Sequence, residues 1–243
     1  MPILQFTSVT MSYGRGATRM VALDDVSFVV PGGAFTILLG PSGAGKSTLL
    51  KLVLAMERPE SGTICVADRD IHRLRKNSIP YMRRNVGAVF QDFKLLPDCT
   101  ALENVSLALE VLGLPSKTIR DRASKALRRV ELDPNTRRPA RCMSGGEQQR
   151  IAIARALAGE PALLLADEPT GNLDPRLSRE ILEVLGEVTE AGTSVVLATH
   201  DPVVRHHAAI THELQLDGGK LVFDSLTEEQ EPLRELALVG ATA

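Results

Sequence analysis

Three short runs of mostly apolar residues predict strands, at residues 35–39, 162–166 and 194–199. The last two are typical of strands buried on both faces of a parallel sheet. Between the last two, residues 177–191 carry apolar side chains at helical spacing. A strand, a helix and a strand in this order form a βαβ unit, so the pattern predicts an α/β fold with a mostly parallel sheet.

A different pattern occurs near both ends of the chain. Residues 3–13 and 21–30 are predicted strands, with a weak alternation of apolar and polar positions in the second, and residues 61–66 form another short run. We expect the first two segments to form a small antiparallel sheet, and residues 61–66 to form a further short strand. Residues 214–223 read as a β-hairpin with a glycine turn.

The middle of the chain is predicted to be helical. A short strand over 86–91 ends in Gln91, after which apolar residues recur at helical spacing from Leu102 to Leu112, and a second helix spans about 116–130. We therefore interpret the chain as one domain of 243 residues. Its predicted parts are a catalytic core with the β subdomain (1–91 and 143–223), a helical subdomain (92–142) and a peripheral C-terminal tail (224–243).

Composition and charge narrow the possible partners and the compartment. The net charge is −2, the chain has no Trp, and its small basic pairs lack interleaved aromatics, so we expect no nucleic acid partner. Three widely spaced cysteines indicate a reducing compartment rather than a disulfide framework. The sequence shows no signal peptide and no apolar run of the ~20 residues that cross a bilayer. We expect a cytoplasmic protein that a partner holds at a membrane if it works there.

A phosphate-binding loop follows the first apolar run. Residues 40–47 read G-x-x-x-x-G-K-S, in which backbone N–H groups surround phosphate oxygens. Lys46 can reach the β- and γ-phosphates, and the Ser47 hydroxyl can bind Mg²⁺. A strand before the loop and a helix after it favour this interpretation over a chance glycine turn. The predicted nucleotide-binding residues here are Gly40, Pro41, Ser42, Gly43, Ala44, Gly45, Lys46, Ser47 and Thr48.

Polar residues at the ends of the predicted strands supply candidate catalytic groups. Asp167 and Glu168 follow a buried strand, where ligands bind in α/β sheets. Asp167 can hold Mg²⁺ opposite Ser47, and Glu168 can accept a proton from an attacking water. His200, at the next strand end, can contact the γ-phosphate, and Gln91 can sense Mg²⁺ and the water. Each residue also has an alternative interpretation. Asp167 and Glu168 can be an acid pair on the surface, His200 can be a structural histidine, and Gln91 can be a polar residue without a role.

Two further features leave alternatives open. Tyr13 ends the first predicted strand and either stacks on a base or is an ordinary edge-strand aromatic. Ser144, Gly145, Gly146 and Glu147 open a helix with a capping box. A helix start with two glycines can bind an anion, although the phosphate loop already serves one nucleotide. Either another subunit's ATP binds here, or the segment is a simple helix cap.

Together these motifs identify a family. The phosphate loop, Gln91, and the segments 143–150, 163–168, 172–174 and 199–201 follow in order, and residues 3–223 resemble an ABC-transporter ATPase subunit. The resemblance implies a RecA-like P-loop NTPase core, Mg²⁺-dependent ATP hydrolysis, and a head-to-tail homodimer with two ATP molecules between subunits. It also implies that Tyr13 stacks on adenine, that Ser144, Gly145 and Gly146 contact the ATP of the other subunit, and that Asp174 signals across the interface. Met143 stands where the family usually has Leu, a volume-conserving change.

Within the family, the segment after Gln91 is most similar to the FtsE subfamily of bacterial cell-division ATPases. The similarity rests on residues 91–98, Thr100 and 103–105. It implies a membrane partner resembling FtsX, received in a groove around Phe93, Leu95, Leu96 and Leu102, some of which can instead belong to the core. It further implies control of a cell-wall hydrolase or its activator, at the cytoplasmic side of the inner membrane and at the septum.

Two other functions remain open at this point. ATPases of lipoprotein-release and macrolide-export transporters share the run from Asp167 to Asp174, and would differ in their membrane partner. A soluble ABC-type regulator usually needs two ATPase halves or a basic arm, and this chain has one signature motif and neither feature.

Overall fold

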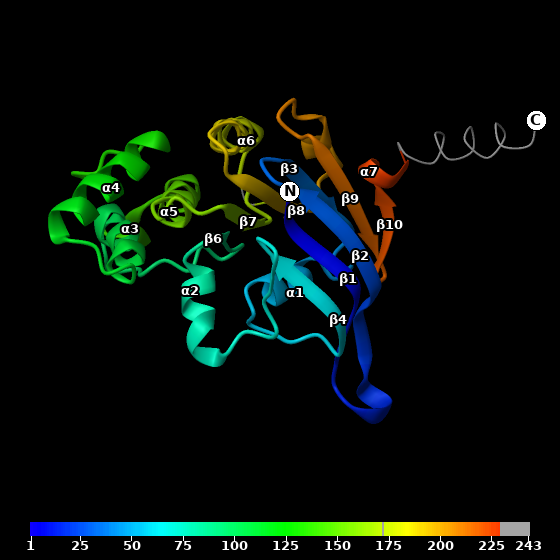
Figure 1. Cartoon of the computed structure of the whole chain (residues 1–243). Coiled ribbons are helices and arrows are strands. Elements are labelled where there is room, and N and C mark those ends of the chain that lie inside the picture. The colour runs from blue at the N-terminus through cyan, green and yellow to red at the C-terminus, as the bar shows by residue number, and fades with distance from the viewer. Residues whose placement is uncertain (172, 229–243) are drawn as a thin grey trace, which may run out of the picture.

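The N-terminal part of the chain forms a small antiparallel sheet, as predicted. The computed structural model describes residues 1–171 and 173–228 (Figure 1). In this sheet the strands lie in the order β2-β1-β4-β5, and each pairs antiparallel with its neighbour. The strands are β1 (Pro2–Tyr13), β2 (Met20–Pro31), β4 (Ser61–Val66) and β5 (Arg69–Asp70).

The second sheet is mostly parallel, which confirms the predicted α/β class. Its order is β10-β9-β3-β8-β7-β6, and only the pairing of β10 with β9 is antiparallel. The strands are β3 (Phe35–Leu39), β6 (Val86–Val89), β7 (Leu163–Asp167), β8 (Ser194–Thr199), β9 (His212–Asp217) and β10 (Lys220–Asp224).

Helices cover the parallel sheet and extend the molecule to one side (Figure 1). The α-helices are α1 (Lys46–Val53), α2 (Ile79–Arg83), α3 (Ala101–Glu110), α4 (Ser116–Arg129), α5 (Gly145–Leu157), α6 (Pro175–Glu190) and α7 (Ser225–Glu228). Short 3-10 turns are η1 (Gly16–Thr18), η2 (Lys76–Ser78), η3 (Ala140–Cys142) and η4 (Pro202–His206).

The buried strands alternate between two cores. Phe35, Ile37 and Leu39 of β3 face a core shared with α3, α4, α5 and α6, while Leu38 faces a core shared with α1 and the antiparallel sheet. Because successive side chains of a strand point to opposite faces, a run that is apolar throughout must be covered on both. This explains why the three apolar runs became central strands whose carboxyl ends meet at one edge.

The helical subdomain begins with a capping box that the structure shows in full. Thr100 Oγ1 accepts a hydrogen bond from the Glu103 N–H, and Glu103 Oε2 accepts one from the Thr100 N–H. Helices α3, α4 and α5 pack together on the left of Figure 1. The proposed domain boundaries stay a prediction.

Some local predictions differ from the structure at their edges. The strand predicted over 86–91 ends at Val89, so Gln91 lies two residues beyond it. Strand β5 and helix α2 were not predicted, because two and five residues are too short to show a period. Of the predicted tail, residues 229–243 lie outside the described part. Within the described ranges, no helix has the length and apolarity that crossing a bilayer requires.

Candidate active site

The phosphate loop lies between β3 and α1, against the antiparallel sheet. Gly45 has φ of 105°, and a Cβ there would lie 2.5 Å from the carbonyl oxygen of Ala22. A Cβ on Gly40 would lie 2.4 Å from the Leu216 carbonyl oxygen. Both contacts are too short for any side chain, so the two glycines let the loop close between β2 and β9.

Lys46 is held inside this loop. Its Nζ donates hydrogen bonds to the carbonyl oxygens of Gly40 (2.7 Å) and Pro41 (3.1 Å), and lies 3.6 Å from Glu168 Oε1. The side chain is only 7% exposed. A buried ammonium at the start of a helix favours a phosphate group nearby, because both the charge and the helix dipole attract anions.

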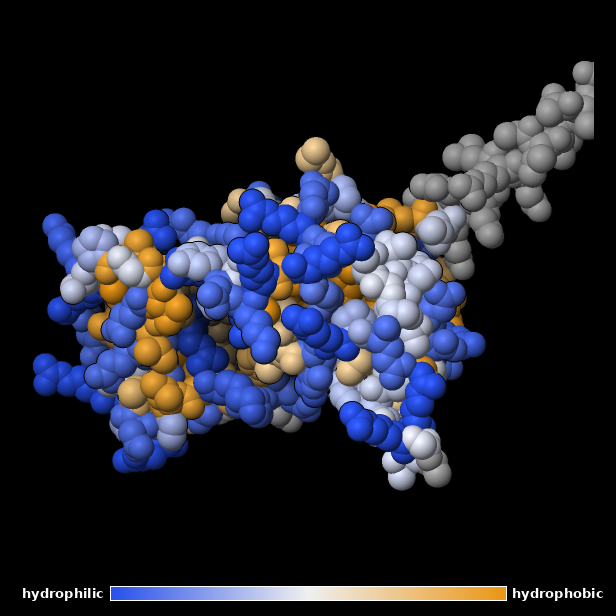
Figure 2. All heavy atoms as spheres, turned by 60° about the horizontal axis from the view of Figure 1, so that its bottom comes forward, coloured by the Kyte–Doolittle hydropathy of each residue, from blue (hydrophilic) through white to orange (hydrophobic). Residues whose placement is uncertain are grey.

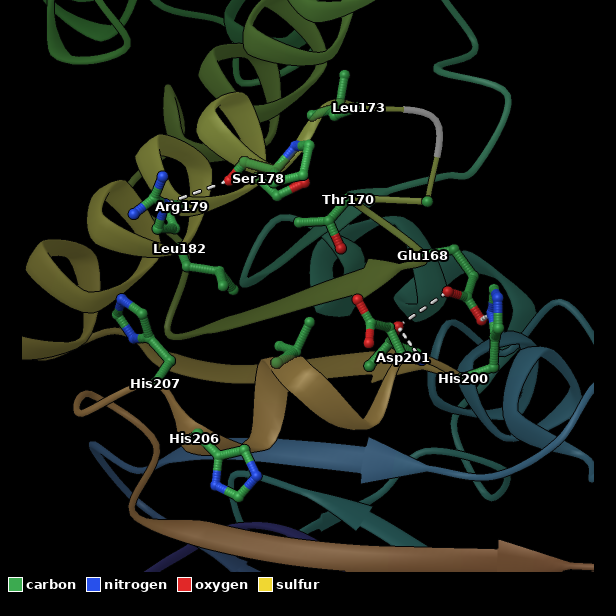
Figure 3. Close-up of a pocket in the computed structure, with 14 residues that line it drawn as sticks. Glu168, Thr170, Leu173, Ser178, Arg179, Leu182, His200, Asp201, His206 and His207 are labelled. Atoms are coloured by element: carbon green, nitrogen blue, oxygen red, sulfur yellow. Dashed lines mark hydrogen bonds and ion pairs between the residues drawn. The ribbon is translucent and has the colours of Figure 1, made fainter.

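Glu168 is fixed at the end of β7. Its Oε2 accepts a hydrogen bond from Thr199 Oγ1 at 3.0 Å, and its Oε1 lies 2.9 Å from Nδ1 of His200. Figure 3 shows that the side chains of Glu168 and His200 point toward each other. The backbone of Glu168 has φ of 48°, which is unusual for a residue other than glycine. Residues held in such strained conformations cluster at functional sites. The arrangement can hold a carboxylate ready to accept a proton from water.

Asp167 and Ser47 fit a divalent cation. The Ser47 hydroxyl hydrogen-bonds to Asp167, whose Oδ1 is buried and has no hydrogen-bond partner among the described residues. Burial raises the pKa of Asp167, and the neighbouring Glu168 adds to this, against the lowering by Ser47. A carboxylate oxygen without a partner beside a hydroxyl suits Mg²⁺, which uses one or two protein ligands together with phosphate oxygens.

Lys46, Ser47, Glu168 and His200 line one cavity of about 520 Å³, whereas Asp167 and the loop residues Gly40, Pro41 and Ala44 are not among its lining residues. Tyr13 lines it, with its hydroxyl 3.5 Å from Thr48 Oγ1, and so does Gln91. Met20, Val21 and Ala22 line the cavity from the start of β2 and were not predicted, because nothing in their residue types indicates a ligand. The lining residues are Tyr13, Met20, Val21, Ala22, Ser42, Gly43, Gly45, Lys46, Ser47, Thr48, Gln91, Glu168 and His200.

The predicted second anion site lies elsewhere. Ser144 Oγ accepts from the Glu147 N–H at 3.3 Å, and Glu147 Oε2 accepts from the Ser144 N–H at 2.8 Å, which confirms the capping box. The described residues that line the nucleotide cavity include none of Ser144, Gly145, Gly146 and Glu147. Ser144 and Gly145 are exposed, so the start of α5 is open to another molecule.

Asp174 caps the N-terminus of α6. Its Oδ1 accepts hydrogen bonds from the backbone N–H groups of Arg176 (2.9 Å) and Leu177 (3.1 Å), which caps α6. A role across a subunit interface therefore stays a prediction for Asp174. The neighbouring Asn172 of the same motif lies outside the described residues.

The four residues of the predicted partner groove divide into two kinds. Phe93, Leu95 and Leu102 are half-buried and pack against the core, whereas Leu96 is 44% exposed. Leu107 of α3 and Val111, directly after this helix, are also exposed, at 42% and 62%. Figure 2 shows apolar side chains gathered at the helical end of the molecule, on its left. An apolar surface of this kind can receive a partner segment.

A larger cavity of about 730 Å³ shares Glu168 and His200 with the nucleotide cavity (Figure 3). It is bordered by α6, with Arg179 and Leu182, and by the segment carrying His206 and His207. It contains no residue of the phosphate loop. The smaller cavity is therefore the candidate nucleotide site, because it brings the lysine, the hydroxyls and the carboxylate together.

Comparisons with known proteins agree with this geometry. The ABC transporter family matches residues 23–171. The chain is 47% identical over 199 residues to the cell division ATP-binding protein FtsE of Haemophilus influenzae, covering 82% of this chain and 90% of that one. It is 44% identical over 219 residues to FtsE of Mycobacterium tuberculosis, covering 89% and 93%. The dimeric structure of the ATP-binding cassette MJ0796 in a post-hydrolysis state, bound to ADP and Pi, matches with a TM-score of 0.84 and 33% identity, covering 91% and 97%.

Proposed function

Because the chain belongs to the ABC transporter family of ATPases, and within it is homologous to FtsE, we propose that it is the ATP-hydrolysing subunit of an FtsEX-type cell-division complex. ATP binding closes a head-to-tail homodimer, and hydrolysis opens it. A membrane partner resembling FtsX passes the motion to a cell-wall hydrolase or its activator. The chain then works on the cytoplasmic side of the membrane at the septum, held there by this partner.

The observation that carries the catalytic part is the fixed carboxylate of Glu168. It lies in the cavity of the phosphate loop, held by Thr199 and beside His200. Glu168 accepts the proton of the attacking water, and His200 contacts the γ-phosphate and orients that water. Gln91, on the cavity wall, responds to the presence of Mg²⁺ and of the attacking water.

The metal and nucleotide ligands come from the cavity and from Asp167, which hydrogen-bonds to Ser47 on the cavity wall. Ser47 and Asp167 hold Mg²⁺, which neutralises charge on the phosphate oxygens. Lys46 and the backbone N–H groups of the loop bind the phosphates. Tyr13 stacks on the adenine ring.

The dimer is supported by the separation, within one subunit, of the nucleotide cavity from the anion site at the start of α5. The exposed start of α5 lies apart from the cavity of its own subunit and presents a capped helix N-terminus that suits an anion. Ser144, Gly145 and Gly146 bind the γ-phosphate held by the other subunit, and Asp174 lies at the interface. The MJ0796 cassette, similar over most of the chain, is dimeric.

A pull-down from membranes tests the partner. The Glu168→Gln variant, which keeps ATP bound, is tagged in its own host and isolated from detergent-solubilised membranes with ATP present. Mass spectrometry is expected to find a membrane protein of the FtsX type together with division proteins. A lipoprotein-release or efflux permease would contradict the division role and assign the ATPase to export, and no membrane protein at all would contradict both.

A matched pair of variants tests whether the membrane partner contacts the predicted groove. Leu96→Asp in the Glu168→Gln background places a charge on the exposed groove residue and should abolish recovery of the partner. Val222→Asp, at a 58% exposed position on β10, makes the same change elsewhere and should leave recovery intact. Equal recovery with both variants would contradict the groove.

A further inference from the structure

The loop between Gln91 and α3 has an unusual backbone. Phe93 and Lys94 are consecutive residues with φ of 59° and 51°, a region that residues other than glycine rarely adopt. Such a conformation persists only where the surroundings impose it. Gln91, which lines the nucleotide cavity, lies two residues before this pair.

Arg155 of α5 imposes this conformation. Its Nη2 donates a hydrogen bond to the Phe93 carbonyl oxygen at 2.7 Å, and its Nη1 donates one to the Lys94 carbonyl oxygen at 2.6 Å. Burial lowers the pKa of the Arg155 guanidinium. Hydrogen bonds from a charged donor are among the strong ones, and the planar fork of arginine suits two neighbouring acceptors.

Asn104, which is fully buried, holds the far end of the same loop. Its Oδ1 accepts from the Leu96 N–H at 2.8 Å, and its Nδ2 donates to the carbonyl oxygens of Leu96 (3.1 Å) and Thr100 (3.0 Å). The backbone N–H of Arg141, just before α5, donates to the Pro97 carbonyl oxygen at 3.0 Å. The loop is thus tied to α5 from one side and to the segment leading into α5 from the other.

We propose that Arg155 is a positioning residue that makes the Gln91 loop and helix α5 move as one body, and so couples the two ATP sites of the dimer. Gln91 lines the nucleotide cavity of its own subunit, while Ser144 at the start of α5 meets the nucleotide of the partner. A shift at one site therefore reaches the other through the two hydrogen bonds of Arg155. This inference rests on the proposed function for the existence of the dimer.

The substitution Arg155→Lys tests the proposal in the full-length chain reconstituted with its membrane partner. Lysine keeps the positive charge but cannot donate to both carbonyl groups in the fork geometry. The matched control is Arg120→Lys, at an exposed position on α4, a helix that packs against α5. Three quantities are compared: the dependence of ATP hydrolysis on ATP concentration, the Kd of ATP in the Glu168→Gln background, and amide hydrogen exchange over residues 92–98.

For Arg155→Lys we expect kcat to fall about tenfold and the Hill coefficient to approach one, within the range of coupling between sites. The Kd of ATP should change by less than about twofold, because the phosphate loop is untouched. Exchange over residues 92–98 should become faster. Arg120→Lys should match the wild type in all three quantities.

Two outcomes would overturn the proposal. One is that Arg155→Lys matches Arg120→Lys in hydrogen exchange and in the Hill coefficient. The other is that hydrolysis and ATP affinity fall together while cooperativity persists, which indicates a purely structural role. A wild-type chain without ATPase activity would contradict the proposed function instead. The exchange measurement needs no hydrolysis and still tests whether Arg155 holds the loop.

Discussion

Nδ1 of His200 lies 2.9 Å from Oε1 of Glu168, although the two residues end different strands. Glu168 follows β7 and His200 follows β8, and these strands are parallel neighbours in the sheet. The carboxyl ends of neighbouring parallel strands lie at the same edge, which brings the two side chains together. His200 is 63% exposed on its outer side, so the ring can reach a ligand while it stays beside the glutamate.

Glu168→Gln should abolish hydrolysis and leave ATP binding intact. The amide can still accept from Thr199 but cannot take a proton from water. A positioned base contributes about 10²–10⁴-fold in rate, so kcat should fall by this factor, which is about 3–5 kcal/mol of barrier. Single-turnover hydrolysis and equilibrium ATP binding separate the two effects. Glu183→Gln, at an exposed position on α6, is the control, and hydrolysis at the parent rate in Glu168→Gln would refute the role of the base.

His200→Ala should lower kcat by about 10²-fold, as removal of one positioned hydrogen-bond donor does. The Kd of ATP should change little, because the loop and Lys46 hold most of the phosphate contacts. His206→Ala removes the same ring from an exposed position outside the nucleotide cavity and should have no effect. If the two variants hydrolyse ATP equally fast, His200 has no part in catalysis.

The strands were predictable and their order was not. The runs at 35–39, 162–166 and 194–199 became β3, β7 and β8 because a strand covered on both faces is apolar at nearly every position. The order β10-β9-β3-β8-β7-β6 depends on contacts between distant segments, and no local pattern contains it. Strand β5 and helix α2 were not predicted, because two and five residues are too short to show a pattern.

The candidate site divides in the same way. Loop and strand-end residues such as Lys46 and Glu168 could be identified because their chemistry and position coincide. The side chains that hold Glu168 and the loop after Gln91 could not be identified, and Thr199 and Arg155 are examples. Thr199 looks like one more β-branched residue of a strand, and Arg155 like one more charged residue of a helix. Their roles depend on which carboxylate or carbonyl groups the fold places opposite them.

Gly45→Ala should destabilise the protein by more than a positive φ alone explains. Alanine at positive φ costs about 1–2 kcal/mol, and at position 45 the Cβ would also lie 2.5 Å from the Ala22 carbonyl oxygen. Gly192→Ala is the matched control, because Gly192 has φ of 99° but a Cβ there meets no described atom within 4 Å. Urea denaturation of both variants separates the two costs. Equal losses would show that the loop can relax around the methyl group.

Asp167→Asn should stabilise the metal-free protein and remove the effect of Mg²⁺. Burial raises the pKa of Asp167 in the folded state, so the ionised form is destabilised there relative to the unfolded chain. The neutral amide has no such penalty. The variant should therefore unfold at a higher temperature than the wild type when the pH lies above this raised pKa and no metal is present.

The difference in stability between the wild type and Asp167→Asn should depend on pH in a defined direction. As the pH falls from above the raised folded-state pKa toward the lower unfolded-state pKa, the wild-type carboxyl becomes protonated, and the stability gap to Asp167→Asn should close. Adding MgATP at neutral pH should make the wild type more stable than Asp167→Asn, because only the carboxylate binds the cation well. Thermal unfolding from about pH 4, near the ordinary pKa of an aspartate, up to about pH 8, with and without MgATP, measures both effects. Equal stabilisation of both proteins by MgATP would mean that Asp167 does not bind the metal, whatever its pKa.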